Sequence, residues 1–408
     1  MASSSTTTTM MNELDKKQTE QDRSDLLLAH QHRLSLQTLP TQSGFRVVAL
    51  FFLHTNHSNN SNSNNMITTC RDDDGRPYLV GTNTESCWIG NSICAERAVM
   101  TQLRWIPDAI VAKIVIVTDA PNAIAPGMLC REFMSSSHGP ISRKTRIVLG
   151  GTDCRLLLDV PVVCGDNKDE DKEDEVSVGG KNEEQPQRQV KESTMEIVTT
   201  LQELYPYPSI YLQKPVSACI KFGKQYSQHC KTVMETLLDE PCLQLWQVAK
   251  SYAALDNQHP GLHPIQYGAA VLFEDGSIIG AHQVKATEYG CSLDAVSQLG
   301  RDILQKQRTE NVTPARIIQV DQFGIAHAPF APARAFLVEQ GFGPVQVIVC
   351  SQETYGDGGE EENGGAQFAP GMTVQIVTVH DLTPASLDIG DLHGSSSSSN
   401  GNPTRCCR

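Results

Sequence analysis

The sequence predicts an α/β protein that contains one domain twice, each copy a mixed five-stranded sheet packed between helices. Apolar runs of strand length alternate with segments of helical spacing along the chain. This order repeats in the second half, where the interval from Gly280 to Leu293 equals that from Gly81 to Cys94. A repeat of this size is typical of tandem domains, and 408 residues are enough for two of them.

The predicted domain boundaries follow changes in composition. The first domain is expected at 11–206 and the second at 228–388, with a linker at 207–227 between them. Segments rich in Ser, Thr, Asn, Gly or acidic residues lack the apolar side chains that a core requires. They predict disordered tails at 1–10 and 389–408. They also predict two insertions within the first domain, at 54–74 and 165–192.

The elements of the first domain follow in order from its apolar patterns. Leucines separated by charges predict a helix at 11–35, and the apolar run at 45–53 predicts a strand. Helical spacing at 94–105 ends before Pro107. The run at 109–118 is apolar enough to predict a strand that is buried on both faces. The remaining expectations are a return strand at 78–81, a helix starting at 130–134, one or two strands within 146–163 and a short helix at 199–205.

The second domain repeats this order. Glu274-Asp275-Gly276 is a turn signal between two short apolar runs and predicts a hairpin. Its strands are expected at 268–273 and 278–280. The other predicted elements are helices at 243–255, 293–305 and 331–339 and strands at 315–320, 345–350 and 374–378.

Composition excludes several classes of function. The formal charge of −14 and the absence of a Lys/Arg stripe argue against a nucleic-acid partner. The most apolar run, 47–53, is far too short to cross a bilayer, so no membrane partner is expected. The N-terminus has no secretory pattern, and 13 scattered cysteines do not form a small disulfide scaffold. These features predict a cytoplasmic protein with reduced thiols.

Two short peptides carry the chemistry. Cys94-Ala95-Glu96 opens a predicted helix, where the helix dipole stabilises a thiolate that can bind a metal. A glutamate two residues beyond that thiolate can reach a water on the metal. Pro126 to Glu132 starts another helix after an apolar strand and contains Cys130. Two helix N-termini directed at one ion form a plausible zinc site.

These peptides resemble those of the zinc-dependent cytidine deaminases. That family carries (His or Cys)-Ala-Glu followed by Pro-Cys-x-x-Cys, in which three His/Cys residues hold zinc and the Glu moves protons. Cys94 and Glu96 match the first motif, and Pro126 and Cys130 match the ends of the second. Gly127 stands where the middle cysteine belongs. The chain is therefore similar to the two-domain cytidine deaminases, with one metal ligand missing.

The resemblance also implies roles for residues outside the metal motifs. Asn83 and Glu85 match the Asn-x-Glu whose side chains hold the ribose hydroxyls in the family. Phe45 matches an aromatic that packs on the base. Arg97 matches an arginine that offsets thiolate charge in sites built from cysteine. Together with Zn²⁺ and the proton shuttle Glu96, these residues predict hydrolytic deamination of cytidine or deoxycytidine in pyrimidine salvage, by a homodimer acting on a free nucleoside.

The missing ligand leaves alternatives open. Catalytic zinc usually keeps three protein ligands and one open position. Cys87, in the loop before the helix, is the leading candidate for the third ligand, with Cys70 and Cys154 behind it. Water is another way to fill the position. If zinc is not held, the chain is instead an inactive nucleoside-binding or scaffold protein.

The second domain is predicted to be a degenerate copy. Residues 293–295 are expected at the Cys-Ala-Glu position and 329–333 at the Pro-Cys-x-x-Cys position. His282 is expected at the position of Asn83. None of these peptides keeps a metal-binding motif. The resemblance implies that such a copy packs on the catalytic domain and helps to shape its site.

Overall fold

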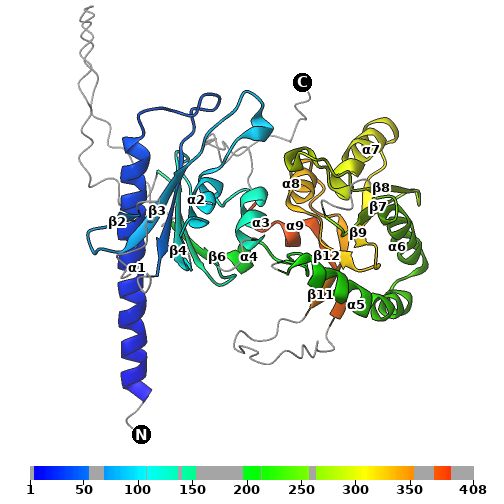
Figure 1. Ribbon diagram of the computed structural model, residues 1–408, viewed down its shortest axis with the longest axis horizontal. Helices are drawn as coiled ribbons and strands as arrows, with labels where there is room; N and C mark the ends of the chain where they lie inside the picture. Colours follow the sequence, from blue (N-terminus) through cyan, green and yellow to red (C-terminus); the bar gives the residue numbers. More distant parts are fainter. Residues whose placement is uncertain are drawn as a thin grey trace, which may run out of the picture.

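The computed structural model of the protein describes residues 4–54, 69–106, 108–136, 140–152, 196–212, 214–256, 263–352 and 372–386. These residues form two sheets, each with its own helices, which lie next to one another (Figure 1). We call them the first half, which ends at Tyr205, and the second half, which begins at Lys214; residues 206–212 connect the two. The predicted tail at 389–408 and the acidic insertion at 165–192 lie outside the described residues. The α/β fold class predicted from the sequence is confirmed.

The first sheet has six strands in the order β2-β3-β1-β4-β5-β6. Strands β4 and β5 are parallel, and the other neighbours are antiparallel. The strands are β1 (Val47–Leu53), β2 (Cys70–Arg71), β3 (Pro77–Thr82), β4 (Val111–Thr118), β5 (Arg146–Gly150) and β6 (Glu196–Thr200). The helices of this half are α1 (Ser4–Ser35), α2 (Ala95–Leu103), α3 (Met128–Ser136) and α4 (Leu201–Leu204).

Helices cover both faces of the first sheet, and two apolar clusters fill the space between the layers. Helix α1 packs on one face, where Leu26 joins Val115 and Val117 of β4. On the other face, α2 covers Ile114 and Ile116 of the same strand. Strand β4 is therefore buried on both faces, as its continuous apolar run predicts.

Helix α1 is also held on the sheet by buried charges. The ammonium of Lys113, on β4, lies 3.0 Å from the carboxylate of Asp22 and pairs with Asp25 as well. Arg146, on the neighbouring strand β5, pairs with Asp22, and Arg76, just before β3, pairs with Asp25. The aspartates are fully buried, so these pairs are what makes burial of their charge tolerable.

The second sheet has the order β12-β11-β9-β7-β8, with β10 added beside β9. Helices α5 and α6 cover one face, and α7 and α8 cover the other. The strands are β7 (Tyr267–Phe273), β8 (Ile278–His282), β9 (Pro314–Asp321), β10 (Ala326–His327), β11 (Gln346–Gln352) and β12 (Met372–Thr378). The helices are α5 (Val216–Leu237), α6 (Glu240–Ala253), α7 (Ala295–Glu310), α8 (Ala331–Glu339) and α9 (Val379–Leu382).

Several predicted boundaries differ from the structure. Each sheet has five strands, the expected number, and one extra strand of two residues, β2 or β10. In the first sheet the fifth strand is β6, which no predicted strand covers. Strand β2 lies inside the predicted insertion 54–74, because its residues extend the hairpin of β3. Helix α1 begins at Ser4, inside the predicted tail 1–10. Helix α5 occupies much of the predicted linker 207–227, because Phe222 and Tyr226 pack in the second core.

The internal repeat extends to individual residues. An isolated bridge joins Thr84 to Ile93 in the first half, and a matching bridge joins Val284 to Leu293 in the second. Asp294 therefore occupies the position of Cys94, and the predicted correspondence of 293–295 with the Cys-Ala-Glu motif was wrong by one residue. For the same reason Gln283, and not His282, stands at the position of Asn83.

A buried arginine of the first half joins the two halves. Arg131, on α3, is fully buried and donates to the carbonyl oxygens of Pro126 at 2.6 Å and Leu204 at 2.9 Å. It also donates to Pro384 at 2.5 Å and Ala385 at 2.7 Å, which belong to the second half. One guanidinium therefore satisfies carbonyl groups of both halves.

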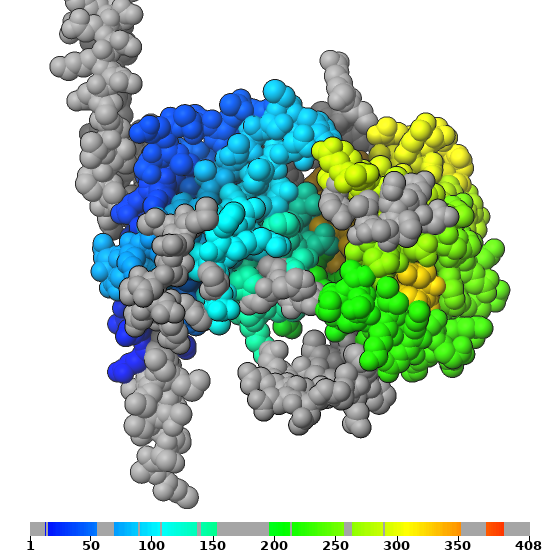
Figure 2. All heavy atoms as spheres, viewed as in Figure 1, coloured from blue at the N-terminus to red at the C-terminus, as the bar shows by residue number. Residues whose placement is uncertain are grey.

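Arg334, on α8, repeats this arrangement in the opposite direction. It donates to Leu382 of its own half and to Pro206 and Tyr207, which follow the first half. Helices α3 and α8 lie side by side between the two sheets (Figure 1). Figure 2 shows the blue-to-cyan first half and the green-to-yellow second half meeting along one side. Within the described ranges, no helix has the length and apolar content needed to cross a membrane.

Candidate active site

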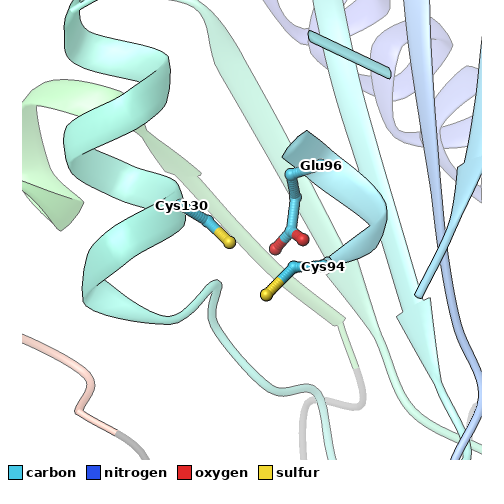
Figure 3. Close-up of side chains that lie close together, drawn as sticks. All are labelled: Cys94, Glu96 and Cys130. Carbon is cyan, nitrogen blue, oxygen red and sulfur yellow. The ribbon is translucent and has the colours of Figure 1, made fainter. Parts of the chain in front are cut away.

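Three side chains converge between the N-termini of α2 and α3 in the first half (Figure 3). Cys94 precedes α2, Glu96 lies in its first turn, and Cys130 lies in the first turn of α3. The two sulfur atoms and a carboxylate oxygen of Glu96 all lie within 4.8 Å of one another. The structure thus brings together the three residues that the metal motifs single out.

The local backbone explains this convergence. Cys94 occupies the N-cap of α2 with extended backbone angles, and its side chain makes no capping hydrogen bond. Its sulfur is therefore free to face Cys130. The bridge between Thr84 and Ile93 holds the chain just before this cap. In α3 the amide of Cys130 donates to the carbonyl of Gly127 at 2.9 Å, which starts the helix immediately after Pro126.

Arg97 lies beside the two cysteines and offsets negative charge on their sulfur atoms. Its guanidinium donates to the sulfur of Cys94 at 3.6 Å and to the carbonyl of Ser92 at 2.7 Å. A hydrogen bond from the Cys130 thiol, followed by the nearby Arg97, lowers the pKa of Cys94 to about 6. The same bond and burial raise the pKa of Cys130. The hydrogen bond between the two sulfur atoms therefore moves the pKa values of the two thiols apart.

Glu96 is almost completely buried, with 3% of its surface exposed. Burial, and then the charge of Cys94, raises the pKa of its carboxyl group to about 7. Its Oε2 is buried and has no hydrogen-bond partner among the described residues. A carboxyl group that is half protonated near neutral pH can both accept and donate a proton.

A cavity of about 280 Å³ opens above this cluster. Glu96 and Cys94 reach it from below, and the ends of strands β1 and β4 form its walls. Its lining comprises Phe45, Val47, Asn83, Thr84, Glu85, Ser92, Ile93, Cys94, Glu96, Ile116, Thr118, Ile124, Ala125, Pro126 and Gly127. All the predicted nucleoside-binding residues, Phe45, Asn83 and Glu85, are therefore placed at one cavity.

Two of these residues already have partners inside the protein. The amide of Asn83 donates to the carbonyl of Phe45 at 2.8 Å and accepts from the backbone of Val47 at 2.9 Å. Glu85 accepts from the backbone amides of Gln42 at 2.7 Å and Ser43 at 2.9 Å. These side chains shape the mouth of the cavity, and only their remaining lone pairs can accept from a ligand.

The position of the missing ligand is open. A Cβ atom built on Gly127 would meet no atom within 4 Å, so no side chain of the described residues has taken the place of a cysteine. Cys87, the predicted substitute, and Cys70 are exposed and do not belong to the cluster of donors. Cys154 lies outside the described residues.

Two cysteine sulfurs, with the carboxyl group of Glu96 beside them, nevertheless form a place that can hold zinc. Cys94 and Cys130 are its soft donors, and Arg97 offsets their charge. The open space beside Gly127 has room for solvent as a further donor. The residues present therefore fit a zinc ion, with fewer protein ligands than a catalytic site usually has.

Sequence reasoning did not single out the part of the cavity that β4 supplies. Ile116 and Thr118 reach the cavity from the end of this strand, and Ile124 to Pro126 follow on the next loop. The available signal was the position of Thr118 at the carboxyl end of a buried apolar strand, where ligands of α/β proteins often bind.

Among the residues that the structure describes, the corresponding place in the second half has no cluster of metal donors. Asp294 replaces Cys94, and its carboxylate caps α7 by accepting from the amides of Val296 at 3.1 Å and Ser297 at 2.9 Å. Val296 stands at the position of Glu96. In α8, Ala333 stands at the position of Cys130, since Arg334 repeats the contacts of Arg131. The predicted loss of chemistry at this place agrees with these substitutions.

Comparison with known proteins gives a limited result. No protein-family model matches the chain, and the comparison with curated proteins found no match. Among solved structures, a cytidine deaminase from Mycobacterium tuberculosis is similar at 18% identity and a TM-score of 0.27, over 37% of this chain and 100% of that chain. A cytidine deaminase from Burkholderia pseudomallei is similar at 17% identity and a TM-score of 0.26, over 45% of this chain and 94% of that chain. Scores this low decide neither family nor activity.

Proposed function

We propose that the first half is a hydrolase that converts cytidine or deoxycytidine to the uracil nucleoside. The observation that carries this proposal is the buried carboxyl group of Glu96, which has an unpartnered oxygen beside two thiols under a cavity. A buried carboxyl oxygen without a hydrogen-bond partner is costly to stability and is typical of a group that serves chemistry. The sequence resemblance to cytidine deaminases supports the same reaction.

Zn²⁺ is the metal that this donor set favours. Cys94 and Cys130 would hold the ion, and Arg97 would balance the charge of the thiolates. When bound, the ion supplies Lewis-acid chemistry that makes water nucleophilic near neutral pH. Binding of the ion would change the pKa of Glu96. The proposal therefore rests on where the Glu96 carboxyl group lies and not on its pKa in the metal-free protein.

Glu96 has the position of a proton shuttle. It takes a proton from the attacking water while the oxygen of that water forms a bond to C4 of the cytosine ring. It then delivers protons to N3 and to the departing amino group. The C4–N bond breaks, and the products are ammonia and uridine. General acid–base catalysis of this kind contributes about 10²- to 10⁴-fold to a rate.

The cavity suits an uncharged nucleoside. Its acidic side chains are Glu85 and Glu96, and none of the described lining residues is basic. A 5′-phosphate would be repelled there, whereas ribose hydroxyls can donate to Glu85 and Asn83. Phe45 supplies an aromatic surface for the ring. These features support a free nucleoside in pyrimidine salvage as the substrate.

The second half would support this site as a scaffold. Its tail supplies Pro384 and Ala385 to Arg131, which follows the metal-binding Cys130 directly. A homodimer belongs to the same proposal. Leu129 and Phe133 on α3 are 45% and 42% exposed, and a second copy would cover them.

An inactive nucleoside-binding protein is the second candidate. The observation that favours it is Gly127, which leaves zinc with one protein ligand fewer than usual. Both candidates predict binding of cytidine in the cavity. Only the first predicts bound zinc and release of ammonia.

The decisive assay measures uridine and ammonia formed from cytidine by the purified full chain, before and after removal of zinc with a chelator. The proposal predicts turnover that disappears on chelation and returns with zinc. Cys94→Ser and Cys130→Ser should abolish it, whereas Cys87→Ser should not, because Cys87 is exposed outside the donor cluster. Absence of turnover with zinc present would leave the nucleoside-binding candidate.

A further inference from the structure

The second half contains a cavity of about 440 Å³ at the place that corresponds to the candidate active site. The equivalence follows from β7 and β8, because Gln283 donates its backbone amide to Tyr267 as Asn83 does to Val47. Ser136, at the end of α3, contributes to the wall, so both halves form this cavity. It is lined by Ser136, Ser209, Tyr211, Leu212, Lys214, Cys219, His263, Tyr267, Gln283, Lys285, Ala286, Ser292 and Phe330.

The charge of this cavity is opposite to that of the first. Lys214, His263 and Lys285 line it, and none of its described lining residues is acidic. Lys285 stands at the position of Glu85, so a single place in the repeat has changed from anionic to cationic. This concentration of basic groups contrasts with the net charge of −14 of the whole chain.

One of the three basic groups is partly neutralised. Lys285 is 6% exposed, and its ammonium lies 3.1 Å from the buried carboxylate of Asp256. The other oxygen of Asp256 accepts from the backbone amide of Tyr267 at 2.9 Å. Burial lowers the pKa of His263, so its ring contributes hydrogen bonding more than charge. Lys214 makes no ion pair within the part of the chain that the structure describes, so the cavity keeps the charge of this lysine.

The rest of the lining suits a hydroxylated ligand with a flat ring. Oε1 of Gln283 is buried and has no hydrogen-bond partner among the described residues, so it can accept from a hydroxyl group. Tyr267 and Phe330 form an aromatic corner, with ring centroids 5.0 Å apart and planes at 85°. Phe330 stands at the position of Gly127, so this ring fills space that is open in the first half.

We propose that the second cavity binds a nucleoside 5′-monophosphate. The phosphate lies against Lys214, His263 and Lys285, a ribose hydroxyl donates to Gln283, and the base packs on the aromatic corner. Phosphates pair well with clustered lysines, and stacking on aromatic rings tolerates any base. This site is independent of the deaminase proposal, because it uses neither the metal cluster nor the first cavity.

The test is calorimetric titration of the full chain with UMP, uridine and inorganic phosphate as separate probes. UMP is expected to bind at least about tenfold more tightly than either fragment, because it alone uses both the basic groups and the aromatic corner. Lys214→Gln should weaken UMP binding about tenfold or more, by loss of a charge-assisted contact. Lys224→Gln is the matched control, because Lys224, on the following helix α5, is exposed and does not line the cavity.

Phe330→Ala provides a second variant that leaves every charge in place, and it too should weaken UMP binding. Equal UMP affinity in Lys214→Gln and Lys224→Gln would overturn the proposal, as would absence of UMP binding. Inorganic phosphate that binds as tightly as UMP would exclude a nucleotide as the ligand. Loss of UMP binding in Phe45→Ala would place the nucleotide in the first cavity and would also contradict the proposal.

Discussion

Replacing Arg131 by methionine tests the junction between the two halves. The substitution keeps an unbranched apolar chain but removes the donor for four carbonyl groups, those of the buried Pro126 and Leu204 and those of the partly exposed Pro384 and Ala385. Hydrogen bonds to a charged group contribute about 1.5–3 kcal/mol each, so the four together contribute about 6–12 kcal/mol. Because Pro384 and Ala385 belong to the second half, the loss should reduce both local stability and the docking of the halves.

Part of that cost is offset, because a buried cation is itself unfavourable. Burial lowers the pKa of Arg131 to about 10, from an ordinary value of 12.5. At 1.36 kcal/mol for each pH unit, removal of the charge returns about 3 kcal/mol. The expected net loss in the free energy of unfolding is therefore about 3–9 kcal/mol. Its lower end matches the range of about 3–5 kcal/mol seen when one partner of a buried charged contact is removed.

The assay is urea-induced unfolding of the full chain, followed by circular dichroism. Arg104→Met is the matched control, because this arginine is exposed at the end of α2 and should change stability by no more than about 0.5 kcal/mol. Arg334→Met should resemble Arg131→Met, since its contacts mirror those of Arg131. A loss below about 1 kcal/mol for Arg131→Met, relative to Arg104→Met, would refute the reasoning.

Three further predictions concern pH, metal and substrate. Burial lowers the pKa of His30 from 6.5 to about 4, and its Nδ1 accepts from Arg33, so the folded state requires a neutral ring. Between pH 6.5 and 4 the imidazole binds a proton in the unfolded state but not in the folded state. The free energy of unfolding should therefore fall by up to about 3 kcal/mol as the pH is lowered through this range. Unfolding curves of His30→Gln should show less of this loss. Gly127→Cys should raise zinc affinity by at least about tenfold in a competition titration, whereas Gly127→Ala, which adds only the Cβ atom, should not. Phe45→Ala should raise the KM for cytidine about tenfold in steady-state assays and change kcat little, because it removes ring contacts made before the reaction.

Much of the fold could be predicted from the sequence, because the apolar patterns reflect burial. The continuous run at 109–118 corresponds to β4, whose alternate side chains enter opposite cores. Strand β6 was missed, because five residues with two apolar side chains give a weak signal next to the acidic insertion. Helix α5 was placed in a linker, although Phe222, Tyr226 and Cys230 recur at helical spacing and pack in the core.

The repeat was predicted, but its register was not. Gly81 and Gly280 were paired in sequence, yet the strand pairing places Ala281 at the position of Gly81. The two glycines serve different contacts. A Cβ atom at Gly81 would meet the carbonyl of Ala95, whereas one at Gly280 would meet the ring of Tyr252. Composition alone cannot separate these two reasons for a glycine.

Part of the candidate site could be predicted from the sequence, because its motifs are local. Cys94 and Glu96 lie two residues apart, and helical geometry alone brings both to one helix start. The contacts of Asn83 and Glu85 with the backbone could not be read, because they depend on how the chain at 42–47 crosses them. The contact between Arg131 and Pro384 joins segments from opposite halves of the chain, so no local sequence pattern predicts it.

The most direct test of the central claim is the rate at which Glu96→Gln forms uridine from cytidine, compared with the unmodified protein at the same zinc content. Glutamine keeps the size and buried position of the side chain but cannot carry a proton. The account predicts that the rate falls by at least about 100-fold, as expected for loss of a general acid and base. A Glu96→Gln protein that retains the original rate would contradict the claim that this carboxyl group moves the protons of the reaction.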